Sequence, residues 1–140
     1  MALKDLALLA KLQELNIETR KIVKNFDKSE RHVLSAEIRQ TVSEMQQLVI
    51  RAAKEQLYER KVRRAPEATF ELLRQCDVKL EFFKFQIDAA CELRLVPPER
   101  YQTWLKLALE AGGLLGGWLK TTEETLARLR PAPARQASLV

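Results

Sequence analysis

The chain has 140 residues, 46% of them hydrophobic and 6% aromatic, and its 24 basic and 19 acidic side chains give a net charge of +5. This length supplies one hydrophobic core and no second domain, while four glycines and five prolines are too few for the turns of a β-sandwich or barrel. No apolar run approaches the ~20 residues that cross a bilayer, and Lys4, Asp5 and Lys11 interrupt the amino-terminal stretch that a signal peptide keeps apolar, so we expect a cytoplasmic protein without a membrane partner.

Turn and proline signals divide the chain into helical segments. The first helix is predicted at about 3–25, and Asp27 or Ser29 then caps a second helix at about 29–63. Pro66 and Pro98 fit the first turn of a helix but not its interior, so they open a third helix at 67–94 and a fourth at 98–129. Short connections favour antiparallel neighbours. The sequence therefore predicts an all-α, antiparallel up-down four-helix bundle over residues 1–129, followed by a flexible tail over 130–140.

Apolar residues recur at helical spacing in every segment and predict one buried face per helix. The predicted core consists of Leu8, Leu12, Leu15, Ile22 and Phe26; Leu34, Ile38, Met45, Leu48, Val49 and Ala52; Leu73, Cys76, Leu80, Phe83, Ile87 and Cys91; and Trp104, Ala108, Leu115, Trp118 and Leu126. The two cysteines lie roughly 22 Å apart along one helix, too far to pair, so we interpret them as small buried hydrophobic residues.

The third segment carries a second apolar stripe on its opposite side. Its members are Val78, Phe82, Phe85, Ala89 and Leu93. One helix of a monomeric bundle needs only one apolar face, and an exposed patch of this size usually marks an interface. The stripe therefore predicts self-association through the third helix. The alternative is that the first helix or the tail covers it.

All four glycines fall within 112–117 of the fourth segment, where each costs about 1 kcal/mol relative to alanine. Gly113 and Gly117 lie one turn apart on the predicted outer side, where a second backbone could approach closely. We assign both to the oligomer interface. The alternative is a kinked or broken helix.

The sequence offers no candidate for catalysis, a metal site or a cofactor. His32, the only histidine, sits in the predicted first turn of the second helix, where an exposed or capping role is expected. The carboxylates of Glu30, Glu37 and Glu44 are a heptad apart, roughly 10 Å, too far to share one metal ion or proton. We therefore predict a binding protein and no enzyme.

Positive charge is concentrated in the first half of the chain. Residues 1–26 carry 5 − 3 = +2 and residues 27–64 carry 9 − 6 = +3, whereas residues 65–96 carry 4 − 6 = −2. The candidate nucleic-acid-binding residues are Arg20, Lys21, Lys24, Arg51, Lys54, Arg60, Lys61, Arg63 and Arg64. Such residues bind phosphates regardless of sequence, and a ring of copies would add their contributions. No aromatic residue is predicted to stand exposed among them, so base-specific binding is not indicated.

From charge alone, an ordinary bundle with a basic helix end explains the pattern equally well. A further alternative is a helical adaptor whose second stripe docks a partner helix without nucleic acid.

Several segments resemble the four-helix-bundle accessory variability determinants of diversity-generating retroelements. The resemblance covers about residues 5–122 and rests on 26–31 (FDKSER), 49–54 (VIRAAK), 72–74 (LLR) and above all 113–120 (GLLGGWLK). Gly116, Gly117 and Trp118 match the family as structural residues. The bundle encoded in intervening sequences of ribosomal RNA genes is similar, but it has a proline after its first helix and an Asn-Ile-Ala-Glu-Gly stretch in its second, which residues 26–27 and 50–54 lack.

The resemblance implies a barrel-shaped homopentamer whose basic surface engages RNA and DNA and which partners the element's reverse transcriptase. In such elements the complex copies a template repeat into mutagenic cDNA, which replaces a segment of a target gene. The accessory protein supplies no catalytic residue.

Overall fold

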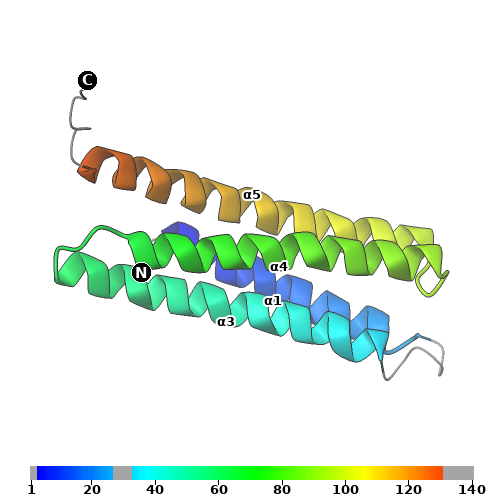
Figure 1. The fold of residues 1–140 in the computed structure, drawn as a ribbon. Helices are drawn as coiled ribbons and strands as arrows, with labels where there is room; N and C mark the ends of the chain where they lie inside the picture. Colours follow the sequence, from blue (N-terminus) through cyan, green and yellow to red (C-terminus); the bar gives the residue numbers. More distant parts are fainter. Residues whose placement is uncertain (1–2, 27–32, 131–140) are drawn as a thin grey trace.

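The computed structural model describes residues 3–26 and 33–130, which form the helices α1 (Leu3–Val23), α3 (Leu34–Lys61), α4 (Glu67–Glu92) and α5 (Pro98–Leu129) and no strand. Successive helices run antiparallel along one bundle (Figure 1). α1 and α4 each pack against both α3 and α5. α1 is therefore diagonal to α4, and α3 to α5. The prediction of an all-α four-helix bundle is confirmed.

The proline signals placed two helix starts correctly. Pro97 has an extended backbone before the first turn of α5, and α4 begins directly after Pro66. The described part of the second helix begins at Leu34. The predicted caps Asp27 and Ser29, and His32, lie outside the described residues.

α3 and α4 end in the same backbone motif. In α3 the Arg63 N–H bonds to the Arg60 carbonyl and the Arg64 N–H to the Glu59 carbonyl, and α4 repeats the pattern around Arg94. This is the Schellman arrangement, whose left-handed residue is usually glycine. Here it is arginine both times, with φ of 58° at Arg63 and 59° at Arg94. The left-handed residue ends each helix about two residues before the predicted boundary.

A buried carboxylate joins the end of α3 to the start of α4. Glu59 is 4% exposed and accepts hydrogen bonds from the Thr69 hydroxyl and the backbone N–H groups of Ala68 and Thr69, at 2.5 to 3.3 Å. These N–H groups belong to the first turn of α4, where a negative charge is favoured. Glu59 thereby fixes the corner that follows the basic end of α3.

The core follows the predicted stripes closely. Trp104 and Trp118 are fully buried; the Trp104 indole donates to the Thr19 hydroxyl at 2.9 Å and meets Phe83 edge-on at 5.8 Å. Burial, with a smaller contribution from Asp77, raises the pKa of Cys76 to about 12, so this thiol stays protonated. Both cysteines are free.

Three predicted core residues are only half-buried: Leu34, Cys91 and Leu126. Each lies in the first or last turn of its helix, where fewer neighbouring residues surround a side chain.

α5 is unbroken through its glycine run, and no glycine has a positive φ. The alternative of a broken helix is therefore wrong. A Cβ on Gly112 would lie 3.4 Å from the Leu80 side chain, whereas a Cβ on Gly113, Gly116 or Gly117 would meet nothing within 4 Å. Among the described residues, Gly112 is thus the one glycine whose Cβ position has a close neighbour.

Candidate assembly face and nucleic-acid interface

The second apolar stripe of α4 faces away from the bundle. Val78 is 67% exposed, Phe82 53%, Phe85 71% and Leu93 57%, and Ala89 is exposed as well. α1, which was the alternative cover for the stripe, packs against α3 and α5 instead. The tail that was the other candidate lies outside the described residues. We call these five residues the α4 stripe.

An acidic edge borders the α4 stripe on the side of α5. Glu81, Asp88 and Glu92 project there at helical spacing, and the Tyr101 hydroxyl of α5 donates to Asp88. That hydrogen bond, followed by desolvation and the Asp88 charge, raises the pKa of Tyr101 to about 12. On the opposite side Lys79 pairs with Glu44 of α3 at 2.9 Å and lowers the pKa of that carboxyl. Lys84 pairs with Glu81 at 2.5 Å, so the negative charge at this border of the α4 stripe that has no basic partner on α4 is that of Asp88 and Glu92.

Gly113, Gly116 and Gly117 are the exposed glycines of α5, which we call its glycine face, and of these Gly116 lies toward α4. Gly116 lines a shallow groove of about 340 Å³ together with Phe70 and Arg74 of α4. Gly113 and Gly117 are exposed, as predicted, and leave the α5 backbone bare of side chains over one turn. The α4 stripe and this glycine face therefore belong to neighbouring helices of the bundle.

The basic residues of α3 gather toward its carboxyl end. Arg60, Lys61, Arg63 and Arg64 are all exposed, and we call them the basic cluster. Arg51 and Lys54 are exposed further back on the same helix. Figure 1 shows that this end of α3 lies at the same end of the bundle as the start of α4 and the end of α5.

The structure does not bring the basic residues of α1 to this cluster. Arg20, Lys21 and Lys24 are at the carboxyl end of α1, which is antiparallel to α3 and therefore lies at the far end of the bundle (Figure 1). One copy therefore presents Arg20, Lys21 and Lys24 at one end of the bundle and the basic cluster at the other, with Arg51 and Lys54 along α3 between the two ends.

One exposed aromatic residue lies beside the basic cluster and was not predicted from the sequence. Tyr58 is 48% exposed, and the Arg64 guanidinium lies 5.9 Å from the centre of its ring. An exposed ring beside arginine is a platform on which an unpaired base can stack. The expectation that no exposed aromatic accompanies the basic residues is therefore wrong. The position of Tyr58 directly before Glu59-Arg60-Lys61 was the sequence feature that could have indicated it.

A model of the bAvd-like family matches residues 6–122. The chain belongs to the bAvd-like family. This agrees with the resemblance noted in the glycine run and identifies the chain as an accessory protein of that type. No curated protein shows significant similarity to the chain.

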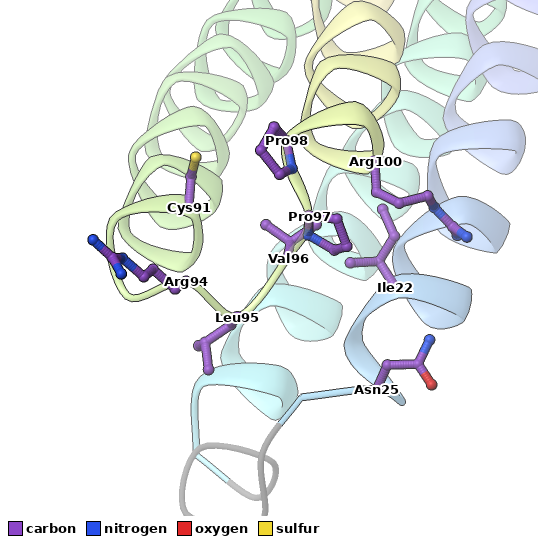
Figure 2. Close-up of a pocket in the computed structure, with 9 residues that line it drawn as sticks. All are labelled: Ile22, Asn25, Cys91, Arg94, Leu95, Val96, Pro97, Pro98 and Arg100. Carbon is purple, nitrogen blue, oxygen red and sulfur yellow. The ribbon is translucent and has the colours of Figure 1, made fainter.

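A cavity of this bAvd-like protein lies at the end opposite the basic cluster. It has a volume of about 630 Å³ and is walled by Ile22 and by the α4–α5 connection, including Val96 and Pro97 (Figure 2). Its polar groups are largely engaged, because Arg100 pairs with Glu18 at 3.2 Å and the Asn25 amide donates to a backbone carbonyl. Figure 2 shows the Arg94 side chain extending away from Val96 and Pro97.

Within residues 3–26 and 33–130, no group of three or more His, Cys, Asp or Glu side chains is placed to hold a metal ion. None of the described helices is both long and apolar enough to span a bilayer.

Proposed function

We propose that this bAvd-like protein is a non-catalytic accessory component of a diversity-generating retroelement. It assembles through the α4 stripe and the glycine face of α5, and it binds template RNA and cDNA through its basic residues. The observation that carries the proposal is the exposure of Phe82 and Phe85, at 53% and 71%, on an otherwise well-packed bundle.

A second copy of the chain is the occupant we propose for the α4 stripe. The α4 stripe exposes two phenylalanines, each by more than half, beside three aliphatic side chains. Exposed apolar patches of this kind usually mark an interface. Gly113, Gly116 and Gly117 support the same conclusion, since each costs about 1 kcal/mol in a helix and gains no close packing against the residues that the structure describes. The partner's backbone supplies the compensating contact.

The basic cluster supports nucleic acid as the ligand. Exposed arginines and lysines release condensed counterions from phosphates whatever the sequence of the strand. Arg63 contributes through its charge beside Arg60, Lys61 and Arg64. Its left-handed backbone costs roughly 1 kcal/mol that glycine would avoid, but Arg94 has the same backbone outside the basic cluster.

Family resemblance supplies the remaining parts of the proposal. The assembly is a ring-like or barrel-shaped homopentamer, and the reverse transcriptase of the element is its protein partner. The accessory protein holds the enzyme and its template together during mutagenic, template-primed cDNA synthesis, which leads to retrohoming.

Titrating RNA at several salt concentrations tests the nucleic-acid half. Log affinity is expected to fall linearly with log salt concentration, by about 0.7 to 0.9 for each phosphate contact. Changing the basic cluster to glutamine removes up to four contacts and flattens the slope by about 3. Changing Arg20, Lys21 and Lys24 to glutamine is the matched comparison at the other end of the bundle. A wild-type protein that binds no RNA at low salt would contradict the proposal.

A further inference from the structure

A small cavity opens beside the basic cluster, between the ends of α3 and α5. Its volume is about 230 Å³. The residues that matter for its chemistry are Gln56, Glu59, Arg60, Arg64, Thr122 and Thr125. One water molecule takes about 30 Å³ of liquid, so the space corresponds to about seven waters. It is too large to be filled by a single ion and large enough for an organic group.

The register of the helices explains where the cavity lies. Gln13 of α1 bonds to Gln46 of α3, and Lys11 of α1 pairs with Glu110 of α5. In antiparallel pairs these contacts set the first residue of α1, Leu3, about level with residue 56 of α3 and residue 118 of α5. The cavity is lined by the parts of α3 and α5 that extend past the start of α1.

The threonine hydroxyls at the cavity are hydrogen-bond acceptors. Thr122 donates its proton to the Trp118 carbonyl at 2.8 Å, and Thr125 donates to the Thr121 carbonyl at 3.1 Å. A hydroxyl has one proton and two lone pairs, and Arg128 already donates to the Thr125 oxygen at 3.3 Å, so Thr122 keeps two acceptor sites and Thr125 keeps one.

Glu59 adds a further acceptor. Its Oε1 receives two hydrogen bonds, from the N–H and hydroxyl of Thr69, and its Oε2 receives one, from the Ala68 N–H. An ionised carboxylate offers about four lone-pair sites, so about one remains, on Oε2. A side chain 4% exposed that lines a cavity and keeps an unused acceptor favours a ligand with N–H donors.

Two arginines that line the cavity also belong to the surface that we propose binds phosphates. Arg60 and Arg64 line it and belong to the basic cluster, and Arg64 also lies over the ring of Tyr58. Pro66 and Leu129 supply apolar surface. A duplex cannot enter such a cavity, because its bases are stacked inside; an unpaired base can be splayed out and bound on its edge.

We propose that this cavity takes one unpaired nucleotide of the strand bound at the basic cluster, and that it prefers a base with an exocyclic amino group. The proposal rests on nucleic-acid binding as the function. Cytosine, adenine and guanine carry such an amino donor, whereas uracil presents a carbonyl oxygen in the place of the cytosine amino group. The acceptors at Thr122, Thr125 and Glu59 can pair with the amino group of cytosine and are left unpaired by the carbonyl oxygen of uracil. Gln56, Arg60 and Arg64, which also line the cavity, supply donors for the C2 carbonyl that both bases carry.

The test compares cytosine with uracil, two bases of the same size. Fluorescent single-stranded RNA octamers of uridine, with either C or U at the central positions, are titrated by anisotropy, beside a blunt duplex of equal length. We expect the C-containing octamer to bind about tenfold more tightly than the all-U octamer. Thr125→Leu fills part of the cavity and removes an acceptor without changing charge, so it should reduce this preference to within twofold and leave duplex binding unchanged.

Thr103→Leu is the matched control, because Thr103 is an exposed threonine of the same helix that donates to the backbone in the same way. It should keep the preference for cytosine. If wild-type protein binds neither octamer nor duplex at low salt, nucleic-acid binding itself is refuted. If it binds both but shows no preference, or if Thr125→Leu keeps the preference or weakens duplex binding equally, only the nucleotide cavity is refuted.

Discussion

Phe85→Ser is the sharpest test of assembly through the α4 stripe. A phenylalanine removes about 200 Å² from water when it is fully buried. Phe85 is 71% exposed, so about 140 Å² remains for a partner to cover. At 25 cal/mol per Å² this amounts to at most about 3.5 kcal/mol for each contact between copies.

The same substitution acts more weakly on the single chain. The remaining 29% of the side chain, about 60 Å², contributes about 1.5 kcal/mol to folding. We therefore expect a folded Phe85→Ser protein that assembles up to about 300-fold less tightly, since 1.4 kcal/mol corresponds to a factor of ten.

Light scattering coupled to size exclusion, over a range of concentrations, measures the effect. The molar mass of the wild-type protein should exceed the 16.1 kDa of one chain and approach the roughly 80 kDa of five copies. The molar mass of the variant should fall to that of one chain at low concentration. Ile17→Ser is the control, because Ile17 is 46% exposed on α1, diagonal to α4. A variant that assembles as tightly as the wild type, or a control that dissociates as readily, would refute the reasoning.

Three further predictions follow from individual residues. Gly117→Leu should keep the helix content of the chain, because a Cβ there meets nothing within 4 Å, but should lower the mass measured by light scattering; unchanged mass would show that no second backbone approaches Gly117. Arg63→Gly and Arg94→Gly should each raise the free energy of unfolding by about 0.5 to 1 kcal/mol in denaturant melts, and only Arg63→Gly should weaken RNA binding. The pKa of Tyr101 is raised from 10.0 to about 12, so the unfolded chain ionises first and the free energy of unfolding should fall as pH rises from about 10 to 12. Tyr101→Phe should make that slope shallower without abolishing it, because the raised pKa values of Cys76 and Lys11 act in the same direction, and a slope unchanged by it would contradict the Tyr101–Asp88 contact.

The helices and the core were predictable because local rules govern both. A period of 3.6 residues identified the inner face of each helix, and the two proline signals placed the starts of α4 and α5. The ends of α3 and α4 were predicted about two residues late, because no glycine marks their left-handed residue. Arginine at that position gives no signal in a sequence.

The features that pattern reasoning missed depend on register between helices. Nothing in the sequence shows that Glu59 reaches the first turn of α4, or that the ends of α3 and α5 extend past α1. The first depends on the turn that brings Glu59 within reach of Ala68 and Thr69, and the second on contacts such as Gln13 with Gln46, which join residues 33 positions apart. The cavity beside the basic cluster therefore emerges only once the helices are packed.

The α4 stripe, which we propose as part of the assembly surface, is separated along the bundle from the basic cluster, whereas Gly116 lies nearer to that cluster, beside Phe70 and Arg74. The α4 stripe starts at Val78, eleven residues and about 16 Å past the first residue of α4, whereas the basic cluster adjoins that first residue. Copies that join through the stripe in one orientation would therefore leave their basic clusters uncovered at one rim of a ring. Each copy would place its Tyr58–Arg64 pair and its cavity on that rim. One strand could then contact several copies at once, and the effective concentration of each further contact would raise overall affinity without any new residue.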